Sequence, residues 1–269
     1  MELTGLTQSG RVCMSASNNI VALTSGGPHS WIMINALRER FGAFPVIMED
    51  GEPSSILWRR RRRMLGTIRV ASMQAARIPM KLTKRGTARI IDDMIRRENL
   101  QPEPPEDIEI IDAPSVNSDT CRAALKRHAP RAVFVVSTRM IGTATLAATE
   151  APFINYHSGI NPGYRGMFGG YFALANDDPE NFGATVHLVD DGVDTGGILY
   201  QSRPAPQPGD NFHTCLWRLA AGSREIVIQA MEDAVEGRLQ PVEVDMASRQ
   251  WFAPTFGGYV WAGLSRGVW

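Results

Sequence analysis

Asn155 and His157 stand two residues apart in the segment P-F-I-N-Y-H, which is largely apolar. Because side chains alternate across an extended strand, both are expected to project from the same side of it. An Asn amide donates an uncharged hydrogen bond, and a His ring can donate a bond or carry a proton near neutral pH. Together they could hold a carbonyl oxygen as it gains negative charge, an effect worth roughly 3–4 kcal/mol per donor.

Carboxylates that could assist His157 lie downstream, in the segment V-D-D-G-V-D-T-G-G. Asp190, Asp191 and Asp194 are the candidates. A carboxylate beside the ring would fix its tautomer and favour its protonated form. The glycines that follow Asp194 would let the backbone turn and approach a ligand. An Asn, a His and an Asp that converge on one carbonyl predict acyl transfer.

An α/β fold would bring these residues together. Short apolar runs alternate with segments of helical periodicity, which predicts a Rossmann-like fold with a mostly parallel central sheet flanked by helices. Ligands bind beyond the carboxyl ends of the strands in such sheets. We expect strands at 19–24, 43–50, 108–114, 132–137, 152–157, 184–190 and from Ile198, and helices after Pro28 and at about 85–98, 118–128 and 211–236.

The chain is expected to have three parts. Residues 1–18 would form a flexible lead, residues 19–237 the catalytic domain, and residues 238–269 an irregular, aromatic-rich extension. An insertion at about 57–105 is basic and helical in pattern, since residues 59–97 hold 13 Lys or Arg against two Asp. Its run Arg59–Arg63 is either a solvated helix face or a cover that meets an anion, such as a nucleotide diphosphate, a polyprenyl phosphate or an anionic membrane.

Composition excludes several classes of protein. The net charge is +0, which gives specific nucleic-acid binding little support. Three widely spaced cysteines and an N-terminus without an apolar leader predict a cytoplasmic protein. No segment is long and apolar enough to predict a membrane span. The five histidines show no metal-ligand spacing, so no metal is expected.

The motif N-x-H-x-x-x-x-P-x-Y-R-G, followed by G-x-T-V-H-x-V-x-x-x-x-D-x-G, resembles the catalytic core of the folate-dependent formyltransferases. The resemblance covers residues 131–204 well and 19–50 loosely. It implies formyl transfer from 10-formyltetrahydrofolate to a primary amine. It also implies that Asn155 and protonated His157 hold the tetrahedral oxyanion, while Asp194 stabilises His157 and helps to relay a proton.

The same resemblance implies binding residues. We expect His187 to pack beneath the site and His29 to lie on a surface loop. Ser158, Gly159 and Asn161 depart from the residues that the family often has in this turn, and we expect these differences to affect which acceptor binds. The implied formyl-donor site consists of Met140, Ile141, Gly142, Asp190 and Asp191. For the acceptor we expect Gly26 and Gly27, whose amides at a helix start could meet a phosphate, together with Tyr164 and Arg165, of which Arg165 pairs with an acidic substrate or braces the turn.

The acceptor that we favour is a small, phosphate-bearing amine, namely an amino sugar linked to a nucleotide. The turn S-G-G-P-H-S lacks the G-S-N form of the glycinamide ribonucleotide enzymes, and no segment after Gly237 resembles the β-barrel of the methionyl-tRNA enzymes. The alternatives are a glycinamide ribonucleotide-type formyltransferase and a formyltetrahydrofolate hydrolase. A non-catalytic folate sensor and a nicotinamide-dependent dehydrogenase are weaker rivals, the latter because G-x-G-x-x-G is missing. A homodimer and a monomer both stay open.

Overall fold

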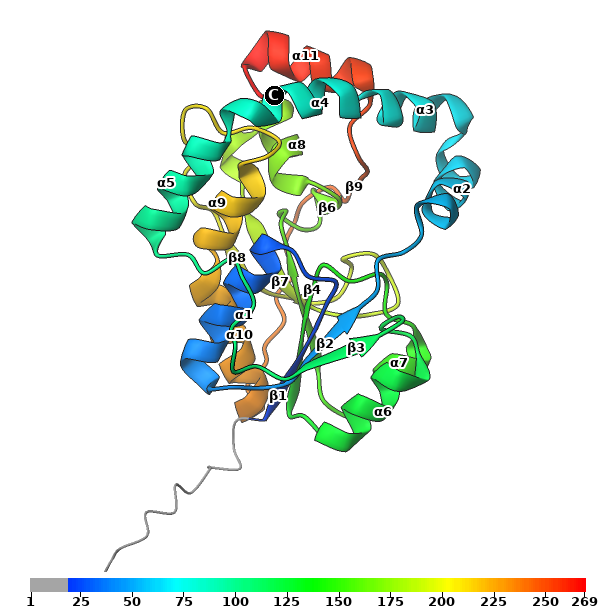
Figure 1. Ribbon diagram of the computed structural model, residues 1–269, viewed down its shortest axis with the longest axis vertical. Coiled ribbons are helices and arrows are strands. Elements are labelled where there is room, and N and C mark those ends of the chain that lie inside the picture. Colours follow the sequence, from blue (N-terminus) through cyan, green and yellow to red (C-terminus); the bar gives the residue numbers. More distant parts are fainter. Residues whose placement is uncertain (1–18) are drawn as a thin grey trace, which may run out of the picture.

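A seven-stranded sheet forms the centre of the protein, with the strand order β3-β2-β1-β4-β5-β7-β8 (Figure 1). The structure is a computed structural model that describes residues 19–269, so the lead predicted at 1–18 lies outside the described residues. β3, β2, β1, β4 and β5 are parallel, whereas β7 and β8 are antiparallel to their neighbours, which confirms the mostly parallel α/β fold. The strands are β1 Ile20–Thr24, β2 Val46–Glu49, β3 Ile110–Ala113, β4 Ala132–Val136, β5 Phe153–His157, β7 Ala184–Leu188 and β8 Ile198–Ser202.

Apolar cores cover both faces of this sheet. β1 and β4 are continuous apolar runs buried along their whole length, as expected of central parallel strands. One core packs the sheet against α1 (Pro28–Phe41), α5 (Ala88–Glu98) and α10 (Arg224–Glu236). The other packs it against α6 (Asp119–His128) and α7 (Thr143–Leu146). The two layers fix the strands, and thereby the side chains at their carboxyl ends.

Helix ends follow the local sequence closely. The Ser118 side chain accepts a hydrogen bond from the Cys121 amide at 3.3 Å, so Ser118 is the N-cap of α6. Gly237, with φ +70°, ends α10. The helix expected over 211–236 is wrong in one respect, because it is broken at Gly222 and Ser223 into α9 (Cys215–Ala221) and α10.

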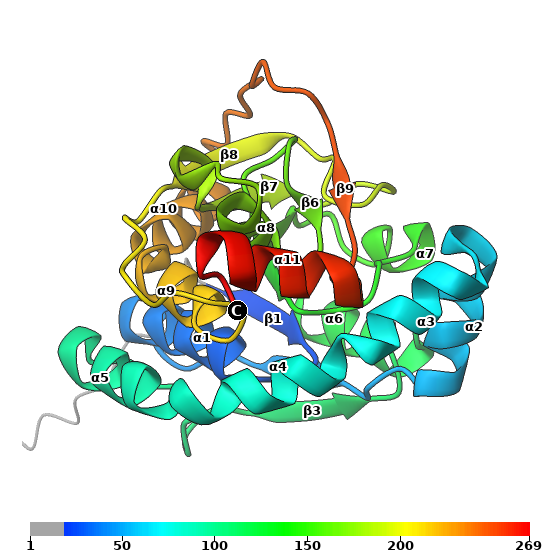
Figure 2. The same ribbon diagram turned by 90° about the horizontal axis from the view of Figure 1, so that it is seen from above.

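The basic insertion forms a chain of helices across the carboxyl end of the sheet (Figures 1 and 2). It begins with α2 (Ser54–Leu65), α3 (Thr67–Ala75) and α4 (Arg77–Thr83). A short 3-10 turn at Lys84–Gly86 leads into α5, which descends along one side of the sheet. We call α2, α3 and α4, together with α11 (Phe256–Arg266), the cap.

The irregular structure expected for 238–269 is wrong in part, because Phe256–Arg266 form α11. Its glycines have low helix propensity, which hides the helix in the sequence. Thr255 caps it by accepting from the Gly258 amide at 3.2 Å, and the Tyr259 hydroxyl meets that of Thr83 on α4 at 2.6 Å. Tertiary packing on the insertion therefore supports this helix.

A third apolar core lies beneath the cap and is rich in aromatic side chains. It receives α8 (Gly169–Ala175), the 3-10 turn Pro179–Asn181, and a two-stranded sheet of β6 (Arg165–Gly166) and β9 (Gln250–Trp251). Tyr164 stacks on Trp251 with ring centroids 5.7 Å apart. Within residues 19–269, no helix combines the length and the apolar character needed to cross a bilayer.

Candidate active site

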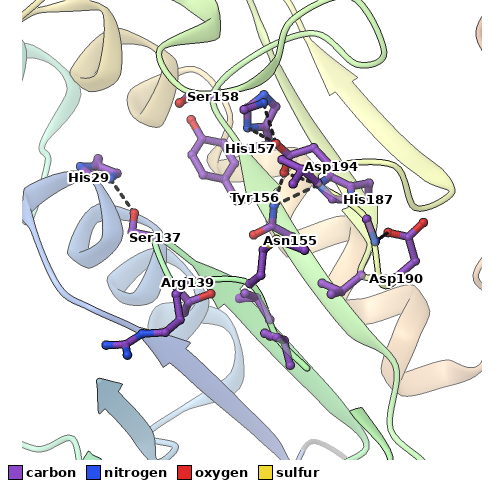
Figure 3. A pocket seen from close by; sticks show the side chains of 18 residues that line it. His29, Ser137, Arg139, Asn155, Tyr156, His157, Ser158, His187, Asp190 and Asp194 are labelled. Atoms are coloured by element: carbon purple, nitrogen blue, oxygen red, sulfur yellow. Dashed lines mark hydrogen bonds and ion pairs between the residues drawn. The ribbon is translucent and has the colours of Figure 1, made fainter. Parts of the chain in front are cut away.

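A cavity of about 270 Å³ opens at the carboxyl ends of β4 and β5 (Figure 3). Its walls come from the start of α1, the loop after β4, the end of β5 with the turn that follows, and the loop between β7 and β8. Asn155, His157 and Asp194 all line it. The sheet therefore gathers at one edge three residues that are far apart in the sequence.

His157 is held through both ring nitrogens. Its Nε2 donates to the Tyr164 carbonyl oxygen at 2.7 Å, and its Nδ1 lies 3.5 Å from Asp194 Oδ2. Because a carbonyl oxygen and a carboxylate are both acceptors, each of the two contacts suits a ring N–H donor. The contact of Nδ1 is the longer of the two, so Nδ1 is the ring nitrogen that is available to donate a hydrogen bond to a reacting group.

Asp194 is fixed by its backbone as well as by its partners. Its φ is +51°, in the left-handed region that Asp adopts more readily than most residues. Oδ2 accepts from the Gly166 amide at 2.8 Å, and the Asp194 carbonyl accepts from Asn161 Nδ2 at 3.2 Å. Burial raises the pKa of Asp194, but the charge of His157 and the Gly166 amide outweigh it, so the pKa lies well below its usual range. The carboxylate is therefore ionised at neutral pH.

His187 belongs to this cluster, although the sequence indicated only a histidine packed beneath it. Its Nδ1 donates to the Leu188 carbonyl at 2.7 Å, which leaves Nε2 to accept from Asn155 Nδ2 at 3.0 Å. Nε2 also lies 3.4 Å from Asp194 Oδ1. His187 thus orients the amide of Asn155. The sequence does not reveal this contact, because it depends on the pairing of His187 with Asn155 in the β5–β7 ladder.

Replacing His187 by Phe is expected to lower kcat of the reaction that the resemblance implies by about 100-fold, because the Asn155 amide would lose the acceptor that orients it. The KM for the formyl donor should stay nearly unchanged. His128→Phe, at the end of α6 and outside the cavity, is the control. Equal activity of the two variants would contradict the orienting role.

The turn after β5 contains Ser158, Gly159 and Asn161, which we expected to affect acceptor binding. Gly159 and Asn161 instead keep the catalytic candidates His157 and Asp194 in position. A Cβ at Gly159 would lie 2.4 Å from the Tyr164 carbonyl oxygen and 2.6 Å from His157 Nε2. Glycine is therefore needed for the bond between those two groups. Asn161 is buried and holds the main chain of Asp194. Only Ser158 lines the cavity.

The loop after β4 is anchored from behind by Glu49 and Asn117. Glu49 is 5% exposed; its Oε1 accepts from the Arg139 amide at 2.6 Å, and its Oε2 from the Val116 amide at 3.1 Å. Asn117 donates to the Met140 carbonyl at 2.8 Å and accepts from the Gly142 amide at 2.6 Å. The sequence indicated neither anchor, because each depends on contacts distant along the chain.

Replacing Glu49 by Ala is expected to lower the free energy of unfolding by about 3 kcal/mol, since it leaves the Arg139 and Val116 amides without an acceptor and removes the carboxylate that pairs with the Arg139 guanidinium. It should also weaken binding of the formyl donor, because the loop loses its support. Urea denaturation and donor titration measure the two effects. Glu49→Gln keeps the shape and part of the hydrogen bonding, so a loss as large as that of Glu49→Ala would contradict this account.

Only some of the residues that the resemblance implies for the donor site line the cavity. Met140, Ile141 and Asp190 line the cavity, whereas Gly142 and Asp191 do not. Asp190 accepts from the Gly192 amide at 3.0 Å and from the Thr195 hydroxyl at 2.8 Å, and so shapes the loop around itself. Asp191 is exposed. Between these loops the cavity has an apolar slot lined by Val135, Ile141 and Val189.

None of the four residues implied for the acceptor lines the cavity. Tyr164 is buried and its hydroxyl donates to Asp178 at 2.7 Å, while Arg165 donates to the Val193 carbonyl at 2.7 Å. These two side chains brace the turn and the Asp194 loop. Gly26 and Gly27 precede α1, and the Gly26 amide already donates to Thr24 Oγ1 at 2.9 Å.

His29 lines the cavity, so the expectation of a surface-loop histidine is wrong. Its Nε2 lies 2.7 Å from the Ser137 hydroxyl (Figure 3), which also accepts from Ser30 Oγ at 3.1 Å. Burial lowers the pKa of His29. A neutral imidazole and hydroxyl groups thus form the polar end of the cavity near α1. In the described part of the chain, no group of three or more His, Cys, Asp or Glu is placed to hold a metal ion.

The family model described as formyl transferase matches residues 71–231 of this chain. Among characterised sequences, the methionyl-tRNA formyltransferase of Anaeromyxobacter sp. (strain K) is 30% identical over 141 residues, which are 52% of this chain and 45% of that protein. That of Synechococcus sp. (strain JA-3-3Ab) is 32% identical over 124 residues, 45% of this chain and 38% of that protein. The chain therefore matches less than half the length of these relatives.

Solved structures share the fold. Glycinamide ribonucleotide transformylase 1 from Symbiobacterium toebii aligns with a TM-score of 0.55 and 19% identity, covering 91% of this chain and 98% of that chain. A sugar N-formyltransferase from Shewanella sp FDAARGOS_354 aligns with a TM-score of 0.54 and 15% identity, covering 86% and 75%. At these identities the similarity shows a common architecture and leaves the acceptor open.

Proposed function

The chain belongs to the formyl transferase family, and on this premise we propose that it transfers the formyl group of 10-formyltetrahydrofolate to a primary amine. The observation that carries the proposal is the convergence of Asn155, His157 and Asp194 on one cavity at the carboxyl edge of the sheet. These groups supply hydrogen-bond donors for an oxyanion and a fixed carboxylate, which acyl transfer to an amine requires.

The formyl donor would lie between the loops after β4 and after β7. The apolar side chains of Val135, Ile141 and Val189 would suit the faces of a flat heterocycle, and polar groups of the two loops, such as Asp190, would suit its edges. Glu49 and Asn117 keep the first loop in place. The residues present therefore suit the pterin ring of the formyl donor.

In the reaction that we propose, the amine nitrogen attacks the formyl carbon and the carbonyl electrons move onto oxygen. Asn155 Nδ2 and His157 Nδ1 stabilise this oxyanion. When the tetrahedral intermediate collapses, the bond from carbon to the folate nitrogen breaks. The proton lost by the amine passes to that nitrogen, either through water or through His157.

Asp194 acts mainly through its charge in this scheme. Because its pKa is held well below the usual range, the carboxylate is a weak proton acceptor at neutral pH. It contributes by keeping His157 protonated and oriented, so that the Nδ1 donor is in place before the substrate binds. We therefore favour this electrostatic role over the proton relay through Asp194 that the resemblance implies.

For the acceptor, we propose an amino sugar linked to a nucleotide. The end of the cavity near α1 offers His29, Ser137, Thr138 and Ser158, which can donate to and accept from sugar hydroxyls. Family members of known structure include a sugar N-formyltransferase of the same fold. The acceptor choice rests on this polar lining and on the sequence departures described above.

The test is release of tetrahydrofolate from 10-formyltetrahydrofolate, followed by absorbance with different amines present. The panel contains nucleotide-linked amino sugars, glycinamide ribonucleotide and methionyl-tRNA. Release that requires an amino sugar supports the full proposal, and release that requires another amine keeps the transferase but replaces the acceptor. Rapid release without any amine, abolished in Asp194→Asn, would show a hydrolase. Failure to bind the folate would overturn the proposal.

A further inference from the structure

The outward side of the cap carries an unusual combination of charge and apolar exposure. We define the cap face as the exposed side chains of residues 54–86 and 256–266, which belong to α2, α3, α4, the turn after α4, and α11. The formyl-transfer site uses none of these residues. Figure 2, which views the protein from above, shows α11 beside α3 and α4 at the front of the molecule.

The charge of the cap face has one sign. Residues 54–86 contain 10 Lys or Arg and no Asp or Glu, and residues 256–266 add Arg266. Within the described residues, two of these eleven cations form ion pairs, Arg60 with Glu52 and Arg266 with Asp177. Most of the others are exposed to solvent. A surface of this kind is complementary to an extended anionic partner.

Large hydrophobic side chains are exposed among these cations. The exposed fractions of Ile68, Leu264 and Trp261 are 88%, 75% and 68%. Within residues 19–269, eleven large hydrophobic side chains are exposed, and eight of them lie on the cap face. A solvated basic helix face, the plainer interpretation of the arginine run, gives no reason for this concentration. The eight are Ile56, Met64, Ile68, Ile78, Leu82, Phe256, Trp261 and Leu264.

Packing places α3, α4 and α11 with their outer faces on one side. Tyr259 and Ala262 of α11 are buried in the third core, and Met80 of α4 packs against it, so the inner faces of α4 and α11 point toward a common interior. The Phe256 amide donates to Ser72 Oγ of α3 at 3.1 Å. The exposed residues of α4 and of α11, opposite those inner faces, therefore share a surface.

We propose that the cap face docks this protein on the headgroup region of an anionic lipid bilayer. Lysines and arginines would meet lipid phosphates, and the exposed aliphatic and Trp side chains would enter the boundary between headgroups and acyl chains. The protein would bind peripherally, because no helix within residues 19–269 is suited to crossing the bilayer.

Other partners match only half of this surface. A second copy of the chain would bring two sets of eleven cations together, which like-charge repulsion opposes. RNA would match the cations but would leave Ile68, Leu82 and Leu264 without apolar contact, since RNA is bound through phosphates and through stacking on aromatic rings and Arg. An anionic bilayer satisfies both features.

Docking would place the active cavity close to the lipid. Arg61 of α2 donates to Met167 Sδ at 3.0 Å, and Met167 follows Gly166, which lines the cavity. The cap therefore contacts a residue adjacent to the wall of the cavity. The proposal itself does not depend on formyl transfer, because binding to lipid can be measured without substrate.

The experiment is cosedimentation of the full chain with vesicles of phosphatidylcholine, alone or mixed with phosphatidylglycerol. We expect binding to the anionic vesicles only, and its loss as the salt concentration rises from about 0.1 M to about 0.5 M. No binding to anionic vesicles at low salt would overturn the proposal.

A charge variant and a matched control locate the surface. The triple variant Arg77→Gln, Lys81→Gln, Arg85→Gln should bind anionic vesicles about 100-fold more weakly, at about fivefold per cation. The control, Arg97→Gln, Lys126→Gln, Arg131→Gln, removes the same charge from outside the cap face. All six side chains are exposed, so both variants should fold, which their melting temperatures verify. Equal binding by the two triple variants would overturn the proposal.

An apolar variant separates lipid from RNA. Ile68→Ser with Leu264→Ser keeps every charge, and we expect it to weaken vesicle binding at least tenfold. Quenching of tryptophan fluorescence by brominated lipid should fall in Trp261→Phe. If the double Ser variant binds vesicles normally, the exposed apolar side chains do not enter the lipid and the proposal is wrong. If the protein binds RNA with an affinity that this variant leaves unchanged, while its vesicle binding is weak, the cap face is a nucleic-acid surface and the proposal is also wrong.

Discussion

Asp194→Asn is expected to lower kcat for formyl transfer by about 1,000-fold, or about 4 kcal/mol. The variant keeps the shape of the side chain, and Asn adopts a left-handed φ such as the +51° at this position readily. What it removes is the negative charge beside His157 and His187. Without that charge the His157 ring loses the carboxylate that orients it, and the oxyanion loses a positioned donor. Steady-state kinetics with saturating donor and amine measure the effect.

The same variant tests the electrostatic account through stability. The pKa of Asp194 is depressed in the folded protein, so ionised Asp194 stabilises the fold above its unfolded pKa of about 4. We expect Asp194→Asn to be less stable than the natural chain by about 2 kcal/mol at neutral pH. The difference should shrink as the pH falls below about 4, where the unfolded chain takes up the proton. A difference that does not change between pH 7 and pH 3 would contradict the depressed pKa.

Asn155→Ala is expected to lower kcat by about 100- to 1,000-fold, the usual cost of removing one oxyanion donor. Asn155 Nδ2 lies 3.0 Å from His187 Nε2 and 3.4 Å from Asp194 Oδ1, so its position is set by the same cluster. The KM values should change little, because the donor acts on the oxyanion and not on the ground-state carbonyl.

Asn155→Asp and Asn176→Ala are the companions of this variant. Asn155→Asp places a second carboxylate near Asp194 and should be at least as inactive as Asn155→Ala. Asn176 is an exposed residue at the end of α8, so its loss should leave kcat unchanged. A small effect of Asn155→Ala would mean that the oxygen is held by other groups.

The features that the sequence predicted correctly are those set by local pattern. Apolar runs located the buried strands, period-two spacing placed Asn155 and His157 on the cavity side of β5, and Ser118 and Gly237 marked helix ends. Each of these depends on residues within a few positions of one another. The resemblance added Asp194, whose carboxylate does approach His157.

The features that the sequence did not predict depend on contacts between distant segments. His187 meets Asn155 only through the register of β5 and β7, and Glu49 meets the Arg139 amide across the sheet edge. Asn161 was read as a feature of the acceptor site, but it is buried and supports Asp194. Such roles follow from the three-dimensional packing and leave no periodic signal in the chain.

Two larger errors have the same origin. α11 is rich in glycine, and its stability comes from Thr255 and from packing on α3 and α4, which intrinsic propensity does not report. His29 was read as a loop residue, but the turn before α1 directs it into the cavity beside Ser137. In both cases tertiary structure overrides the local expectation.

The most direct test of the central claim is a single-turnover experiment with 10-formyltetrahydrofolate labelled with carbon-13 in the formyl group. The natural chain and the Asp194→Asn variant are each mixed in excess with the labelled donor and the amine that supports turnover. The account predicts that the label appears in the N-formyl product with the natural chain and is transferred about 1,000-fold more slowly by the variant. Transfer at equal rates by both proteins, or label that never reaches an amine although the folate is bound, would contradict it.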